Sequence, residues 1–292
     1  MAMFRSGFVS IFGKPNAGKS TLLNSLIGEK LAIVSPKIQT TRHRIRAFLN
    51  GPNYQIIFSD TPGIIEPEYK LHEKMMQAVK NSLEDADVAI LMVDIHERFE
   101  EVDKVFQNFK LQIPAILVLN KIDKVSTGKV EEAESFFRKK NSYRDVLRIS
   151  ASRPINIDLL IEKIVNLLPK GEPFFAEEDL TDMPTRFFVG ELVREKIFAF
   201  LSAEIPYQTA VQVTEFKEKQ DLIKIAADII VQRESQKAII LGERGAMIKK
   251  LGTEARKSIE EFLGSKVYLE LFVKVKPKWR DNERQLKEYG YG

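Results

Sequence analysis

The sequence has 292 residues, which is enough for two domains of ordinary size. Its 44% hydrophobic and 29% charged residues are typical of globular proteins, and no apolar run is long enough to predict a membrane span. The net charge of +4 does not by itself indicate nucleic-acid binding, and the lack of cysteine excludes disulfides and thiolate metal sites. The first residues show no signal-peptide pattern, so we expect a cytoplasmic protein.

In chain order, the first half alternates short apolar runs with segments of helical spacing. FVSIFG at 8–13 predicts a strand that enters a glycine loop, and 21–28 predicts a helix ending at Gly28. Residues 44–60 predict a hairpin around an NGPN turn. Further strands are expected at 87–95, 114–123 and 146–152, and helices at about 69–83, 98–110, 129–140 and 157–168. This alternation predicts an α/β domain with a mostly parallel sheet and one antiparallel edge strand.

The stretch PKGEPFFAEEDLTDMP at 169–184 interrupts this pattern with prolines, a glycine and acidic residues. Such a composition is typical of a linker. We therefore predict a first domain over 1–170, a linker over 171–184 and a second domain over 185–292. The second domain is expected to be α+β, in the order helix, two antiparallel strands, short helix, glycine loop, helix and strand.

The segment GKPNAGKS matches the P-loop pattern G-x-x-x-x-G-K-S, between a predicted strand and a predicted helix. Gly13 and Gly18 allow the backbone amides to point at phosphate oxygens. Lys19 is expected to reach the β- and γ-phosphates, and the hydroxyl of Ser20 to coordinate Mg²⁺. The expected nucleotide contacts in this loop are Gly13, Lys14, Pro15, Asn16, Ala17, Gly18, Lys19, Ser20 and Thr21.

Four further motifs follow, and three of them stand at the carboxyl ends of predicted strands, where open α/β sheets bind ligands. In DTPG (60–63), Asp60 is expected to hold Mg²⁺ through water; in TTR (40–42), Thr41 is favoured over Thr40 as the residue that completes the metal shell. In NKID (120–123), Asp123 can accept both N1–H and the 2-amino group of guanine, a pairing that adenine does not offer. SAS (150–152) can present an amide to guanine O6. These motifs predict GTP or GDP with Mg²⁺ as cofactors, the metal ligands Ser20, Thr41 and Asp60, and nucleotide contacts from Thr40, Thr41, Asp60, Thr61, Pro62, Gly63, Ile64, Asn120, Lys121, Asp123, Ser150, Ala151 and Ser152.

Taken together, GKPNAGKS, QTTRHR, DTPGI, NKID and SAS resemble the Era family of GTPases. The second half resembles the type II KH domain that follows the GTPase domain in that family, so the resemblance covers almost the whole chain. It implies a GTPase that binds 16S ribosomal RNA near its 3′ end and assists assembly of the 30S subunit. It also implies a cytoplasmic protein with peripheral association with the inner face of the cell membrane, and we expect a monomer.

Ile64 stands directly after the DTPG motif, where many small GTPases place a glutamine that orients the attacking water. Isoleucine cannot hydrogen-bond through its side chain, and the resemblance implies a subclass with a hydrophobic residue at this position. No catalytic base is assigned from the sequence, and slow unaided hydrolysis is expected.

A second glycine loop, GERG, lies within AIILGERGAMIKKLG at 238–252 and lacks the Lys-Ser ending of a P-loop. A lone GxxG is compatible with helix-capping glycines, but the order of elements around it favours a KH domain, in which this loop clamps the backbone of about four nucleotides. The acidic Glu243 weakens the electrostatic part of this interpretation. The expected RNA contacts are Ile240, Gly242, Glu243, Arg244, Gly245, Ile248, Lys249, Lys250, Lys274 and Lys276. The alternative is a GTP-switched module for protein interaction or membrane-surface binding, whose second domain does not bind RNA.

Overall fold

The computed structural model describes residues 3–140 and 142–291. By their internal contacts these residues form two compact units. The first comprises the described residues of 3–32, 41–66 and 75–182, and the second comprises 33–40, 67–74 and 183–291. The boundary near the middle of the chain therefore falls between Asp182 and Met183, and two short segments of the N-terminal half group with the second unit.

The first unit is built on a six-stranded sheet in the order β2-β3-β1-β4-β5-β6. Its strands are β1 (Arg5–Gly13), β2 (Ile45–Gly51), β3 (Tyr54–Asp60), β4 (Val88–Asp94), β5 (Ala115–Asn120) and β6 (Asp145–Arg148). Its helices are α1 (Lys19–Ile27), α2 (Lys70–Glu84, whose first residues belong to the second unit), α3 (Phe99–Gln107), the short η1 (Ile122–Lys124), α4 (Thr127–Arg138) and α5 (Ile157–Leu167). Only β2 pairs antiparallel, with β3, and this confirms the predicted sheet with one antiparallel edge.

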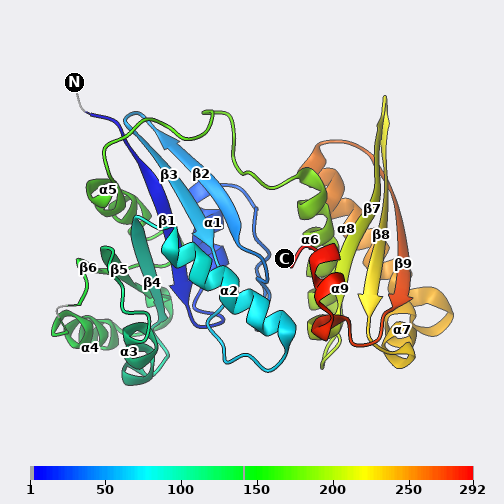
Figure 1. The fold of residues 1–292 in the computed structure, drawn as a ribbon, viewed down its shortest axis with the longest axis horizontal. Helices are drawn as coiled ribbons and strands as arrows, with labels where there is room; N and C mark the ends of the chain where they lie inside the picture. The colour runs from blue at the N-terminus through cyan, green and yellow to red at the C-terminus, as the bar shows by residue number, and fades with distance from the viewer. Residues whose placement is uncertain (1–2, 141, 292) are drawn as a thin grey trace. The chain divides into compact units, whose positions relative to one another are not determined.

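The strands β4 and β5 are apolar up to their last residues, Asp94 and Asn120, because helices cover the sheet on both faces. In the view of Figure 1, α2 crosses in front of the sheet and α1 lies behind it. All six residues of β5 and all but the last residue of β4 are buried. The helices α3 and α4 add an aromatic cluster to this core, in which the rings of Phe99 and Phe137 meet edge to face at 5.7 Å. This packing fixes the carboxyl ends of β1, β4 and β5 relative to one another.

The predicted linker stretch packs within the first unit along the free edge of β2. The Phe48 amide donates to the Leu180 carbonyl at 2.9 Å, and the rings of Phe48 and Phe175 stack at 3.9 Å. The buried side chain of Gln55 accepts hydrogen bonds from the amides of Phe174 and Phe175 at 2.6 and 3.0 Å. An exposed edge strand invites pairing with other chains, and this strap covers it.

The second unit contains a three-stranded sheet in the order β7-β8-β9. The strands β7 and β8 are antiparallel, whereas β8 and β9 are parallel. Its described elements are α6 (Thr185–Phe200), η2 (Pro206–Gln208), β7 (Ala210–Lys219), β8 (Leu222–Val231), α7 (Glu234–Leu241), η3 (Glu243–Gly245), α8 (Ala246–Leu263), β9 (Val267–Val275), η4 (Trp279–Asp281) and α9 (Glu283–Glu288). From α6 to β9 the helices and strands follow the predicted order of helix, two strands, short helix, glycine loop, helix and strand, whereas η2, η4 and α9 were not predicted.

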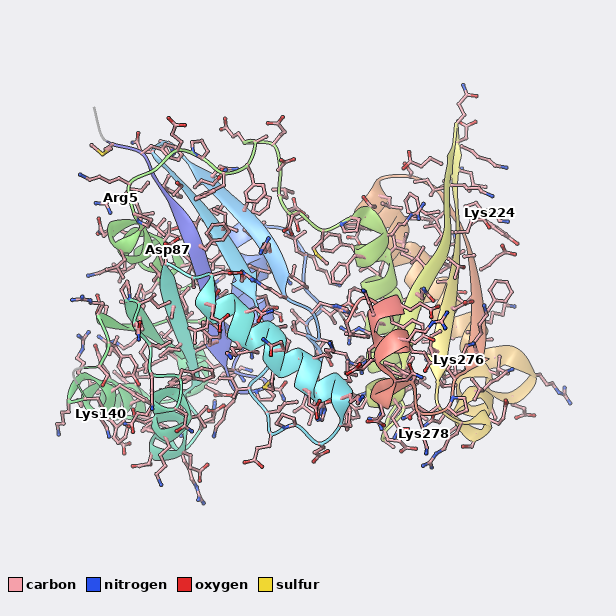
Figure 2. The ribbon with its side chains drawn as sticks, in the orientation of Figure 1. Arg5, Asp87, Lys140, Lys224, Lys276 and Lys278 are labelled. Atoms are coloured by element: carbon pink, nitrogen blue, oxygen red, sulfur yellow. The ribbon has the colours of Figure 1, made fainter. Side chains whose placement is uncertain are left out.

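The helices of this unit pack on one face of the sheet, and the C-terminal segment closes one end of its core. Apolar residues of α6, β8, α7 and α8 form one cluster, with Ile197, Ile229 and Ile259 fully buried. The Trp279 ring is also fully buried, and its Nε1 donates to the Gln208 carbonyl at 3.1 Å. Beyond β9, Lys276 and Lys278 extend from the exit of the strand (Figure 2). No helix among the described residues is long and apolar enough to cross a membrane.

Candidate functional site

The P-loop connects β1 to α1 and curls tightly around the buried Lys19 side chain. Gly18 adopts φ +101°, and a Cβ there would lie 2.3 Å from Asn120 Nδ2, so only glycine fits. Lys19 Nζ donates to the carbonyls of Gly13 and Lys14 at 3.1 and 2.9 Å. Burial lowers the pKa of Lys19 to about 8, against the attraction of the Asp60 carboxylate. The loop thus holds a cation at the place where the motif predicts phosphate.

The three predicted metal ligands meet beside this loop, although they come from α1, the segment before β2 and the end of β3. Ser20 Oγ donates to Asp60 Oδ2 at 2.6 Å and lies 2.7 Å from Thr41 Oγ1. The other Asp60 oxygen, Oδ1, is buried with no hydrogen-bond partner in the structure, and burial raises the pKa of this carboxyl to about 6. Hydroxyl and carboxylate oxygens are the ligands that Mg²⁺ prefers, and the orphaned Oδ1 fits a nearby cation. The cluster therefore fits a magnesium ion with its waters.

Thr40 is placed differently from Thr41. Its hydroxyl donates to the Lys37 carbonyl at 2.7 Å, its carbonyl accepts a hydrogen bond from Arg194, and all three residues belong to the second unit. Of the two threonines, the structure brings only Thr41 to Ser20 and Asp60.

The NKID and SAS loops interlock through buried hydrogen bonds at the ends of β5 and β6. Asn120 donates from Nδ2 to the Ala17 carbonyl at 2.8 Å and accepts from the Ala151 amide at 3.0 Å. It thereby joins the P-loop to the SAS loop. Asp123 Oδ1 accepts a 2.7 Å hydrogen bond from Ser150 Oγ, and this bond is the main cause that lowers the pKa of Asp123. The Asp123 carboxylate is therefore an ionised acceptor at neutral pH.

Ile64 and Gly63 form the junction between the DTPG motif and the P-loop. The Ile64 amide donates to the Gly13 carbonyl at 3.1 Å, and its side chain packs against the apolar core. A Cβ on Gly63 would lie 2.8 Å from the backbone nitrogen of Pro15, so this approach requires glycine. Most of the remaining predicted contacts lie on the same loops, and Thr21 lies in the first turn of α1: Lys14, Asn16, Thr21, Thr61, Pro62 and Ser152. The isoleucine side chain at position 64 has no group that could accept or donate a proton.

Two acidic residues that the sequence analysis did not single out lie at the carboxyl end of β4. Asp94 is the last residue of this strand, and its Oδ2 accepts a hydrogen bond from Lys121 Nζ of the NKID motif at 2.5 Å. Glu97 follows in the next turn, where Lys14, Lys19 and Lys121 are the nearby cations and Asp94 is the nearby anion. The only sequence signal for either residue is its place at the carboxyl end of a strand.

Glu97→Gln is expected to stabilise the nucleotide-free protein at pH 8 but not at acidic pH. Burial raises the pKa of Glu97 to about 7, and Oε2 is buried without a hydrogen-bond partner. A carboxyl whose pKa is raised on folding lowers the free energy of unfolding as the pH rises above its unfolded-state pKa. This loss reaches its full size once the pH exceeds the folded-state pKa. The gain in the free energy of unfolding should be roughly 1 kcal/mol at pH 8, since partial exposure screens the charge, and should shrink towards pH 5. Urea denaturation at both pH values measures it, and an equal gain at both would assign the effect to packing.

The second glycine loop joins α7 to α8 in a conformation that glycine makes possible. Gly242 has φ +69°, and a Cβ there would lie 2.7 Å from Met247 Cβ. Gly245 has φ +80° and precedes the first residue of α8. Between them Arg244 also has a positive φ, +50°, and its side chain is exposed together with that of Glu243. The loop therefore presents its backbone and one cation to solvent.

The other predicted RNA contacts are not equivalent in the structure. Lys249 is exposed on α8, whereas the Lys250 ammonium lies 4.4 Å from the centre of the Phe200 ring. Lys274 pairs with the Asp228 carboxylate at 2.5 Å. Ile240 is fully buried in the core, so its side chain is not available to RNA and we leave it out of the proposed RNA surface. Sequence reasoning could not make this distinction, because adjacent isoleucines at 239 and 240 look alike.

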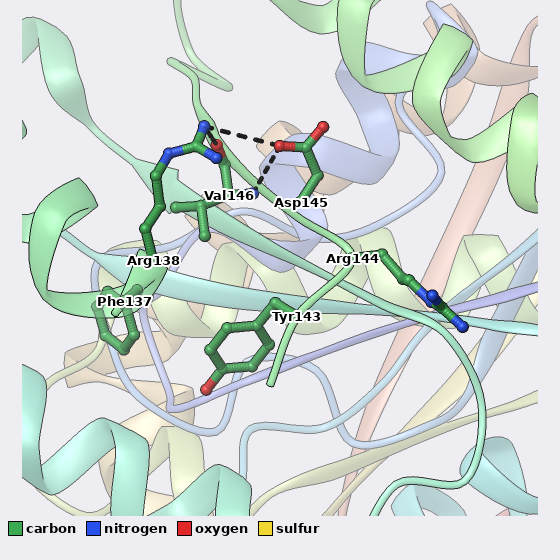
Figure 3. A pocket seen from close by; sticks show the side chains of 6 residues that line it. All are labelled: Phe137, Arg138, Tyr143, Arg144, Asp145 and Val146. Carbon is green, nitrogen blue, oxygen red and sulfur yellow. Dashed lines mark hydrogen bonds and ion pairs between the residues drawn. The ribbon is translucent and has the colours of Figure 1, made fainter. Parts of the chain in front are cut away.

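A small hollow of about 130 Å³ lies away from these loops, between the end of α4 and β6 (Figure 3). Arg138 spans its rim, donating to the Val146 carbonyl at 3.0 Å and lying 3.7 Å from the Asp145 carboxylate. The hollow lies at the start of β6, whereas the SAS loop follows the other end of this strand. The nucleotide motifs do not reach it, so it is no part of the candidate site.

The two units match two family models. Residues 8–121 match the model of the 50S ribosome-binding GTPase, and residues 204–280 match that of the KH domain. With the P-loop, the Ser20–Thr41–Asp60 cluster and the NKID and SAS loops together at the carboxyl ends of the strands, the chain is a P-loop GTPase followed by a KH domain.

Comparison with whole proteins narrows this class. The chain is 45% identical to GTPase Era of Caldanaerobacter subterraneus over 99% of its length and 98% of that protein, and 44% identical to GTPase Era of Geobacter metallireducens with the same coverage. A crystal structure of an Aquifex aeolicus Era variant bound to GDP·AlF4⁻ matches with a TM-score of 0.95 and 42% identity, over 99% of this chain and 100% of that one. A structure of Era with MgGDPNP and nucleotides 1506–1542 of 16S ribosomal RNA matches equally well, covering 99% of both chains. The chain belongs to the Era family of GTPases, and its reaction is the hydrolysis of GTP to GDP and phosphate.

Proposed function

We propose that this protein is a GTP-driven switch whose KH unit binds 16S ribosomal RNA near its 3′ end and which assists assembly of the 30S subunit. The observation that carries the proposal is the similar Era structure that holds MgGDPNP and nucleotides 1506–1542 of 16S ribosomal RNA. The GERG loop supports this proposal. Gly242 and Gly245 have no side chains that would block the approach of an RNA backbone, and the cationic side chain of Arg244 is exposed between them.

In the nucleotide site, the roles follow from the contacts of each residue. Lys19 and the P-loop amides would bind the β- and γ-phosphates, and Ser20, Thr41 and Asp60 would hold Mg²⁺, directly or through water. The magnesium ion supplies charge neutralisation at the transferred phosphoryl group. Asp123 would accept the two guanine donors, while the aliphatic stem of Lys121 lies along the base.

The attacking water has no side-chain partner at Ile64, so another group must orient it. Backbone groups, a further cation or a bound partner are the remaining means. Without such help we expect hydrolysis to take on the order of minutes to hours per event, as in small GTPases without an activator. We place the protein in the cytoplasm as a monomer, with peripheral association with the inner face of the membrane as a secondary site.

Binding of a single-stranded RNA with the sequence of the 3′-terminal region of 16S ribosomal RNA tests this function. The wild-type protein should bind this RNA more tightly than a scrambled RNA of equal length and charge, because base contacts add to the phosphate contacts that both RNAs offer. Filter binding with GDP or a non-hydrolysable GTP analogue measures the preference in each nucleotide state. Equal affinity for both RNAs, together with binding to anionic lipid vesicles, would instead favour a membrane-surface module.

A further inference from the structure

We propose that Asp94 is a positioning residue for the guanine pocket: its carboxylate holds the Lys121 ammonium against the Asn16 carbonyl and so ties the base-recognition loop to the P-loop. The inference rests on the proposed function, in which the stem of Lys121 lies along the base. Asp94 belongs to none of the GTPase motifs, and none of the sequence patterns assigns it a contact with a phosphate or with the base.

The sheet places Asp94 where it can act on the NKID loop. It is the last residue of β4 and pairs in register with Asn120, the last residue of β5. Lys121 follows immediately, and its Nζ lies 2.5 Å from Asp94 Oδ2. The same Nζ donates to the Asn16 carbonyl at 2.8 Å. One ammonium therefore bridges the end of β4 and the P-loop.

Both oxygens of the Asp94 carboxylate are engaged, so its orientation is fixed. Oδ1 accepts the His96 amide at 3.0 Å and lies 2.8 Å from His96 Nδ1, which leaves Oδ2 directed at Lys121. The side chain is only 15% exposed, against 25% for that of Lys121. Burial alone would raise the pKa of Asp94, but the hydrogen bonds from Lys121 and His96 outweigh it and hold the pKa below its usual value. The carboxylate is thus charged at neutral pH.

The backbone at Lys121 needs such an anchor. Lys121 has φ +66°, in the left-handed region that costs most non-glycine residues about 1 kcal/mol or more, whereas asparagine tolerates this region, as Asn16 does at φ +65°. Such conformations persist only where the surrounding contacts determine them. The Asp94–Lys121–Asn16 bridge is a contact of this kind at the two loops that would enclose the base and the phosphates.

A double-mutant cycle tests the inference. Asp94→Asn keeps the shape of the side chain and removes its charge; it should lower the affinity for GDP and for GTP equally, by roughly tenfold, the scale of one charged hydrogen bond. In the Lys121→Met background the same change should cost less than about twofold, since its target is gone. Asp94→Glu, which keeps the charge, should retain most of the affinity. Stopped-flow measurement of nucleotide dissociation, alongside calorimetry, gives these values, and thermal melting of nucleotide-free protein reports folding.

Glu101→Gln is the matched control. This carboxylate lies 3.8 Å from Lys14 Nζ on the exposed face of α3, whereas Lys121 Nζ is held by Asp94 and the Asn16 carbonyl, so guanine-nucleotide affinity should stay close to that of the wild type. Unchanged affinity in folded Asp94→Asn, or an equal loss in both backgrounds, overturns the positioning role. A wild-type protein that binds ATP as well as GTP would instead refute the proposed base pocket, so the two failures are distinguishable.

Discussion

Asp123→Asn is expected to lower the affinity for GTP and GDP by at least a hundredfold and to create a preference for xanthine nucleotides. Asp123 is positioned as an ionised acceptor beside the SAS loop, and two charge-assisted hydrogen bonds to guanine N1–H and the 2-amino group contribute roughly 1.5–3 kcal/mol each. The amide of asparagine donates to the C2 carbonyl of xanthine, where guanine has a donor. Calorimetric titration with GDP and with xanthosine diphosphate measures both effects.

Ser150→Ala serves as the control for Asp123→Asn. It removes the hydrogen bond from Ser150 to Asp123 but keeps the carboxylate that would recognise the base. It should weaken binding of guanine nucleotides modestly and leave the preference for guanine over xanthine intact. An Asp123→Asn variant that still prefers GDP to xanthosine diphosphate would show that another residue reads the base.

Arg244→Asp should weaken binding of the 16S 3′-terminal RNA about tenfold or more and make the salt dependence shallower by roughly one phosphate contact. The exposed cation between the two loop glycines becomes an anion facing the RNA backbone. Aspartate tolerates the left-handed backbone that Arg244 adopts at φ +50°, so the loop should keep its shape. Filter binding across a salt series measures the effect, while GTP affinity and thermal stability should remain near wild type.

Lys219→Asp is the matched control, with the same kind of charge reversal in the same unit. Lys219 is exposed at the β7–β8 turn, whereas α7 and the GERG loop follow the other end of β8. RNA affinity should change little in this variant. Equal RNA affinity in wild type, Arg244→Asp and a Lys249→Asp/Lys250→Asp variant would remove the glycine loop from the RNA surface.

The fold class and the order of elements followed from the sequence because their signals are local. A glycine loop between an apolar run and a helical pattern predicts a P-loop without knowledge of distant residues, and fully apolar runs such as β4 and β5 predict strands buried on both faces. The carboxyl ends of parallel strands lie at the same end of a sheet, so the sequence alone predicts that the motifs containing Asp60, Asn120 and Ser150 lie together. The same reasoning indicated the antiparallel β2–β3 pair from its turn.

Tertiary structure alone decided what depends on residues far apart in the chain. Asp94 and Lys121 are separated by 27 positions, and no periodicity reports that pairing a strand end with its neighbour brings their charges together. The stretch that composition marks as a linker packs on the first sheet, where Gln55 of β3 bonds to Phe175, 120 positions later. Ile240 is buried while its neighbour Ile239 is half exposed, because the rotation of α7 on its sheet is set by packing. The sequence thus determined the chemistry of the loops through local backbone requirements, whereas long-range packing determined which charges and edges meet.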